Sequence, residues 1–323
     1  MGSGFRALRR RILTPDVSET SLAKRGFHQK NDQSTAVLEK IGETFLTGYG
    51  DAVESRTAQE TEDRLARIPE RFRGFSYEGA GMGLAMLDGL PFGHRHHVAD
   101  FLAGPGDPHN YLVYVGVGWA MARLPRFAWP ASEAFDPLLR WLVLDGYGFH
   151  QAYFHTRKYV QEQYQAPRFS WPRGNGGYAN RVIDQGIGRA LWFVCGTDAD
   201  LVTRTLAKFA PHRRGDLYAG VGLAATYAGG VEADELRLLV ERAGEHGGQL
   251  AQGSAFAAEA RVRAGLVVPH IGLATEILCG LPVEDAARIT QDVRPSGPNG
   301  DAIVYDTWRE DIARQIVAVG SRG

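Results

Sequence analysis

A short glycine motif recurs seven times along this chain of 323 residues. The motif is Gly-x-Gly or Gly-x-Ala, and its copies begin at Gly48, Gly79, Gly116, Gly146, Gly186, Gly220 and Gly253. Successive copies are 30 to 40 residues apart, and each lies in an apolar segment. A repeat of this length is typical of stacked helix pairs. The pattern therefore predicts an all-α fold of stacked helix–turn–helix repeats, similar to an α-solenoid.

The spacing inside the motif explains why glycine is needed. Residues i and i+2 of a helix lie roughly 200° apart around its axis, so small residues there allow close approach on two sides. Each glycine costs about 1 kcal/mol relative to alanine, and close packing must recover that cost. Seven copies also argue against a dinucleotide-binding loop at Gly116, because one nucleotide site needs one copy.

The segments between the motifs indicate partner helices and loops. Residues 198–208 and 232–242 have helical patterning, and Asp136-Pro137 is typical of a helix start. The last third is similar to Sel1-like and tetratricopeptide pairs. We predict a partly disordered basic arm over residues 1–30. Residues 31–323 should form one helical-repeat domain with a long Pro/Gly loop at 166–178, which is either a binding loop or a surface connection.

Composition excludes several classes of protein. A net charge of −1 gives no bulk attraction for nucleic acid. The longest strongly apolar stretch, residues 111–121, is too short for a bilayer, which takes about 20 residues, so no transmembrane segment is expected. Two cysteines do not make a disulfide framework, and no apolar signal stretch follows the basic start. We therefore expect a cytoplasmic protein.

Three acids lie close to glycine motifs and are candidate catalytic groups. Glu78 and Asp145 precede a motif by one position, and Asp184 precedes one by two. Equivalent positions of stacked helices tend to line one surface, where a partly buried carboxyl has a raised pKa suited to proton transfer. Salt bridges to Arg73, Arg181 or Arg189 are the alternative, and the sequence leaves both open.

The polar cluster at residues 145–155 adds His150 as a fourth candidate catalytic group or, alternatively, a structural histidine. Asp145, His150 and His155 are spaced by five residues, which does not place them on one helical face, so no metal site is predicted there. The sequence leaves any cofactor unknown. The residues expected to contact a substrate are Tyr77, Phe149, Tyr153, Phe154, Arg189, Trp192 and Phe193.

Six blocks, in order, resemble the UnbL family, a domain-of-unknown-function family whose genes accompany enediyne polyketide synthases. They are residues 13–27 (LTP, ET and RGF), 73–85 (RGFSYEGAGMGLA), 101–106 (FLAGPG), 145–150 (DGYGFH), 184–193 (DQGIGRALWF) and 220–224 (GVGLA). The resemblance implies a role in enediyne natural-product biosynthesis and brings no catalytic residues. The loop at 166–178 does not match the family pattern.

Three hypotheses follow from this resemblance. The first is an enzyme that acts, with other enediyne pathway proteins, on the linear polyene or polyyne intermediate of the synthase in an aromatic tunnel. The second is a non-catalytic helical-repeat scaffold or chaperone that holds pathway enzymes or shelters the intermediate. The third is a binding protein that sequesters the finished product.

Overall fold

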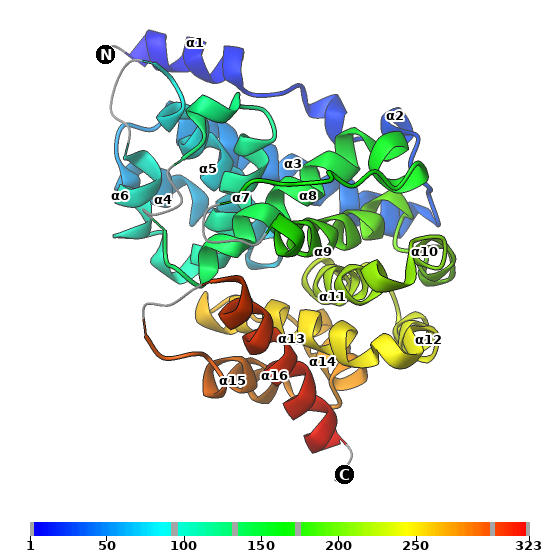
Figure 1. Cartoon of the computed structure of the whole chain (residues 1–323). Coiled ribbons are helices and arrows are strands. Elements are labelled where there is room, and N and C mark those ends of the chain that lie inside the picture. Colours follow the sequence, from blue (N-terminus) through cyan, green and yellow to red (C-terminus); the bar gives the residue numbers. More distant parts are fainter. Residues whose placement is uncertain (1–2, 92–95, 131–134, 172–175, 298–300, 321–323) are drawn as a thin grey trace.

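The computed structural model describes residues 3–91, 96–130, 135–171, 176–297 and 301–320. Within these ranges the chain forms sixteen α-helices and no strand, so the predicted all-α fold is confirmed. The two termini lie at opposite ends of the molecule (Figure 1). No helix among the described residues combines the length and apolarity needed to cross a membrane.

One set of helices carries the glycine motifs: α3 (Asp32–Glu54), α5 (Glu70–Asp88), α7 (Asn110–Met121), α8 (Leu142–Phe154), α9 (Gly176–Val194), α11 (Pro211–Ala228) and α13 (Gly247–Arg263). The other helices are α1 (Ser3–Leu13), α2 (Leu22–Arg25), α4 (Ala58–Leu65), α6 (His97–Leu102), α10 (Ala199–Leu206), α12 (Ala233–Ala243), α14 (Pro269–Leu278), α15 (Val283–Asp292) and α16 (Ala302–Gly320). Short 3₁₀ turns are η1 (Val17–Thr20), η2 (Asp107–His109), η3 (Arg126–Ala128), η5 (Leu139–Trp141) and η7 (Gly244–His246), and η6 (Arg157–Gln161) is a π-helix.

The motif helices stack in chain order, from α3 through α5, α7, α8, α9 and α11 to α13 (Figure 1). From α5 to α11, the first glycine faces the preceding helix and the second faces the next. A Cβ added to Gly186 would lie less than 3.0 Å from the carbonyl oxygen of Asp145 in α8. A Cβ added to Gly188 would lie less than 3.0 Å from the carbonyl oxygen of Leu217 in α11. The prediction that small residues admit neighbours from two directions is therefore confirmed.

Neighbouring motif helices run parallel. Gly79 of α5 meets the backbone of Phe45 in α3, whereas Gly83, one turn later, meets that of Tyr49. Residue numbers therefore increase in the same direction in α3 and α5 along their contact, so the axes of the two helices are parallel. A connection must therefore return across the molecule between successive motif helices.

The returning segments form an outer layer in the C-terminal half. Helices α10, α12 and α14 pack on one another beside α9, α11 and α13, and α10 lies above α12 at the right of Figure 1. Asp198 caps α10 by accepting the N–H of Leu201 at 2.9 Å. The partner helices predicted at 198–208 and 232–242 are thus confirmed as α10 and α12. Asp136 accepts the N–H groups of Leu138 and Leu139 at 2.9 Å and opens η5 and α8, as predicted.

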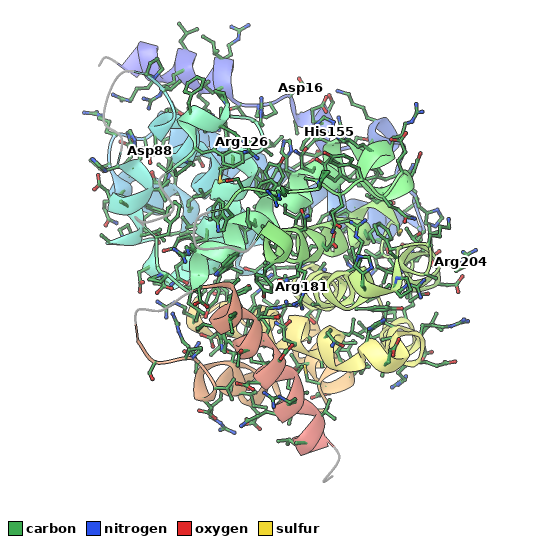
Figure 2. All side chains as sticks on the ribbon, in the orientation of Figure 1. Asp16, Asp88, Arg126, His155, Arg181 and Arg204 are labelled. Atoms are coloured by element: carbon green, nitrogen blue, oxygen red, sulfur yellow. The ribbon has the colours of Figure 1, made fainter. Side chains whose placement is uncertain are left out.

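The array curves until its beginning meets its later helices. Ser34, at the start of α3, donates from Oγ to the Gly230 carbonyl after α11 at 3.0 Å. Arg261 of α13 donates from Nη2 to the carbonyls of Arg71 in α5 and Tyr227 in α11, each at 3.0 Å. These contacts close the motif helices around an interior. Arg181, labelled in Figure 2, joins α9 to α16 through Asp306 at 2.6 Å.

The N-terminal segment packs on α3. Arg10 of α1 pairs with Asp51 at 2.9 Å and with Glu54 at 2.8 Å, and η1 and α2 follow along the same helix. The boundary at residue 30 stays a prediction. Phe169, in the predicted loop at 166–178, is buried against Tyr147 with ring centroids 5.2 Å apart. Residues 172–175 of that loop lie outside the described residues, and α9 begins at Gly176.

Candidate functional site

The interior of the array holds a cavity that opens to solvent. Its walls come from α3, α5, α7, α8, α9 and α11, and the segment containing η1 borders one end. The exposure of the lining side chains distinguishes the mouth of the cavity, which is open to solvent, from its buried floor. Arg123 is exposed and Phe154 is half-buried, whereas Glu78 and Arg189 are only 2% and 6% exposed. Nearly all the other lining side chains are apolar or aromatic.

The polar groups of the floor come from three helices. Trp119 of α7 donates from Nε1 to Glu78 Oε1 of α5 at 3.0 Å. Arg189 of α9 lies with Nη2 3.5 Å from the same oxygen. Among the described residues, no hydrogen bond to Glu78 Oε2 is found, so this oxygen is available to a bound molecule.

Arg189 also forms a closer ion pair, from Nη1 to Asp145 Oδ1 of α8. Asp145 borders a second, smaller cavity of about 420 Å³, which is lined mainly by apolar side chains of α7, α8, α11 and α13. Arg189 and Tyr227 border both cavities. The guanidinium thus stands between the two cavities, with one carboxyl on each side.

Two buried carboxyls, those of Glu78 and Asp145, share the single guanidinium of Arg189. Their pKa values depend on burial and on how closely each contacts this guanidinium. Burial raises the pKa of Glu78 and of Asp145 above their ordinary values, and Arg189 opposes this in both cases. Arg189 lies closer to Asp145 than to Glu78. Arg189 therefore favours the ionised form of Asp145 more strongly than that of Glu78.

His150 of α8 lines the same cavity nearer the mouth. It is 6% exposed, and its ring meets Trp119 edge-on at a centroid distance of 5.6 Å. Burial, and then the charge of Arg123, lower the pKa of His150 from 6.5 to about 3. Its buried Nδ1 has no hydrogen-bond partner among the described residues. The imidazole is therefore neutral at physiological pH and can still bond a ligand.

The neutral His150 has a consequence for acid stability. Because its pKa is depressed in the folded protein, the unfolded chain binds the extra proton, and stability is lost as pH falls below 6.5. Between pH 7 and pH 5 we expect His150 to cost about 2 kcal/mol of unfolding free energy. Urea unfolding at both pH values should show this loss in wild type and a smaller one in His150→Phe. Parallel pH profiles would contradict the neutral imidazole.

The predicted substrate-contacting residues separate into two groups. Phe149, Tyr153, Phe154, Phe193 and Arg189 line the main cavity. Tyr77 lies elsewhere, stacked on His109 with ring centroids 3.4 Å apart and bonded through its hydroxyl to Glu62. Trp192 also lies away from the cavity and donates from Nε1 to the Gly229 carbonyl at 3.0 Å.

Among the predicted catalytic groups, Asp184 is separate from the other three. It lies between α9 and α11, where Arg213 donates to both of its oxygens at 2.6 and 2.9 Å. Burial raises the pKa of Asp184 to about 6, while Arg213 acts in the opposite direction. Glu78, Asp145 and His150 are brought to the interior of the array, and Asp184 forms a structural ion pair.

Several cavity residues were not predicted from the sequence. They are Phe45, Phe75, Met82, Trp119, Arg123, Leu223 and Tyr227. The signal that locates them is their register relative to the glycine motif. From α5 to α11, the lining residues fall four or one positions before the first glycine, or three, four, seven or eight after it. We call this set of positions the inner face. Tyr77 and Asp184, two positions before a motif, fall outside it.

No group of three or more His, Cys, Asp or Glu side chains in the described ranges is arranged to hold a metal ion. Both cysteines are free and buried, and burial raises the pKa of each thiol to about 12. The titratable groups that line the cavity are the carboxyls of Glu19 and Glu78, the imidazole of His150, the phenols of Tyr153 and Tyr227 and the guanidinium groups of Arg123 and Arg189.

Comparison with known families identifies the chain at a coarse level. The family described as "Protein of unknown function (DUF1702)" matches residues 4–316. The chain belongs to the DUF1702 family. The match spans the whole motif array, so the cavity of this DUF1702 protein lies entirely within the family's domain. The chain matches no curated protein and no solved structure at a significant level.

Proposed function

We propose that this protein is an enzyme of enediyne biosynthesis that isomerises a linear polyene or polyyne precursor by proton transfer from Glu78. The observation that carries the proposal is a buried carboxyl, that of Glu78, whose pKa is raised by burial at the floor of an apolar, aromatic cavity. The sequence resemblance to the UnbL family supports the choice of substrate class.

The proposed step is redox-neutral. The proton of Glu78 forms a C–H bond with one carbon of the conjugated chain, using the electron pair of a double bond. The delocalised cation that remains loses a proton from another carbon to the Glu78 carboxylate. Double bonds have then moved, the carboxyl has been regenerated, and no oxidant or reductant takes part.

The cavity suits such a cation. The faces of Trp119 and Phe149, whose ring centroids are 5.0 Å apart, can stabilise positive charge through their quadrupoles. Asp145, ionised beside Arg189, adds a negative charge at the floor. Apolar walls exclude water, which would otherwise trap the cation as an alcohol.

Isotope exchange tests the chemistry directly. Purified protein, incubated with a synthetic all-trans linear polyene in D₂O, should introduce deuterium into the chain and shift its absorbance. Glu78→Gln should lower the exchange rate at least about 100-fold, as expected when a general acid is lost, while still binding the polyene. The matched control Glu245→Gln, at a side chain 87% exposed, should exchange like wild type. Undiminished exchange in Glu78→Gln would overturn the assignment of the proton donor.

Complementation tests the biological role. In a producing strain that lacks this gene, wild type and Glu245→Gln should restore enediyne production, whereas Glu78→Gln should not and a linear precursor should accumulate. Production restored by Glu78→Gln would instead favour a protein that shelters the intermediate without acting on it. Production that persists in the deletion strain would contradict the pathway assignment.

A further inference from the structure

We infer that the mouth of the main cavity is a carboxylate-binding site, in which Arg123 and His150 hold the anionic end of a chain whose apolar part extends to Glu78. The inference rests on the proposed function for the apolar part of the ligand and adds the chemistry of its end group. The substrate class becomes a linear conjugated carboxylic acid.

Arg123 supplies the positive charge. It follows α7 and lines the cavity, yet its guanidinium makes no hydrogen bond or ion pair with any described residue. It lies four positions after Trp119, so both side chains project from the same face of the chain. A guanidinium offers two parallel N–H donors that match the two oxygens of a carboxylate.

His150 supplies a second polar atom inside the mouth. Its side chain is 94% buried, since 6% is exposed, and its unpartnered Nδ1 belongs to a ring that lines the cavity. The ring centroids of His150 and Phe154 are 4.7 Å apart, so the imidazole packs against an aromatic side chain of the same helix. Arg123 and His150 line the same cavity, and the charge of Arg123 contributes to the lowered pKa of His150.

The remaining charges at the rim leave a positive balance. Glu19, which borders the cavity, is paired with Lys24 at 2.5 Å and with Arg25. Arg25 also lies 4.7 Å above the Phe154 ring. Glu39 accepts the N–H of Leu22 at 3.0 Å. Glu19 is thus already paired with two cations, whereas Arg123 is a cation of the cavity lining that no carboxylate neutralises within the described residues.

The floor is less favourable for an anion, which sets the direction of the chain. The single charge of Arg189 is already paired with Asp145, and the carboxyl of Glu78 lies beside it. A carboxylate entering the floor would meet two acids in a place shielded from water, whereas at the mouth it meets an unpaired guanidinium. The acid end therefore stays at the mouth and the hydrocarbon end reaches Glu78.

The test compares a fluorescent conjugated tetraene fatty acid, parinaric acid, with its methyl ester. Wild type should bind the acid at least about tenfold more tightly than the ester, since a hydrogen-bonded charge is lost in the ester. Arg123→Gln should remove most of this preference and leave ester binding unchanged. His150→Phe, which keeps an aromatic ring, should weaken binding of the acid only.

Arg204→Gln is the charge-matched control. Arg204 lies on the outer helix α10, labelled at the right of Figure 2, and its side chain is 64% exposed. The Arg204→Gln variant should bind both the acid and the ester like wild type. Two results would overturn the carboxylate site: equal affinity of wild type for acid and ester, or an acid preference that survives in Arg123→Gln. Either result would still leave the apolar cavity as a site for the hydrocarbon chain. Binding of neither probe would overturn the proposed function as well.

Discussion

Replacing Gly220 with alanine is expected to lower the free energy of unfolding by about 3 kcal/mol or more, the upper end of the usual cost of overpacking. A Cβ at this position would lie less than 3.0 Å from three backbone atoms of α9, in Gln185 and Arg189. Backbone cannot rotate aside as a side chain can, so α9 and α11 would have to separate. Urea unfolding followed by circular dichroism measures the loss.

The same helix offers a matched control. Gly215 of α11 has no atom closer than 3.7 Å to an added Cβ. Gly215→Ala should therefore raise the free energy of unfolding by up to about 1 kcal/mol, the difference in helix propensity. Equal effects of Gly215→Ala and Gly220→Ala would show that propensity, and not contact between helices, determines the role of the motif.

Replacing Arg189 with methionine is the second change with a large expected effect, about 3 to 5 kcal/mol of lost stability at pH 7. The substitution removes the guanidinium that both Glu78 and Asp145 contact and leaves two buried carboxyls without a counter-charge. The combined variant Arg189→Met with Glu78→Gln and Asp145→Asn should recover most of the loss, because no buried charge remains.

The pH dependence of Arg189→Met provides an independent check. Burial already raises the pKa of both carboxyls, and losing Arg189 raises each further. The folded protein then binds more protons than the unfolded chain above the ordinary carboxyl pKa of about 4, so its stability falls as pH rises. Thermal unfolding should show Arg189→Met closest to wild type at pH 4 to 5. A deficit that is constant with pH would contradict the charge explanation.

The fold could be predicted from the sequence because its main cause is local and steric. A glycine on each side of a helix has few uses other than close packing. The number of copies of the motif therefore predicts how many helices pack in this way. Curvature could not be predicted. It depends on contacts such as that between Ser34 and Gly230, which are almost two hundred residues apart and have no signal in the spacing.

One residue of helical register decides which of the candidate residues reach the interior. Glu78 and Asp145 lie one position before a motif and reach the interior, whereas Asp184 lies two before and points about 100° away, toward Arg213. Tyr77 differs from Glu78 in the same way. Trp119 could not be predicted from acids or polar clusters because it belongs to neither, although it lies on the inner face three positions after Gly116.

The glycine contacts occupy the two flanks of each motif helix, and the inner face is a third, separate strip. The spacing of the helices and the character of the interior are therefore encoded by different positions. Substitutions on the inner face change the shape and polarity of the cavity without touching the contacts that set the helix spacing. Such a division makes the architecture evolvable: a lineage can acquire a new ligand by altering a few inner-face side chains while the same glycines continue to specify the fold.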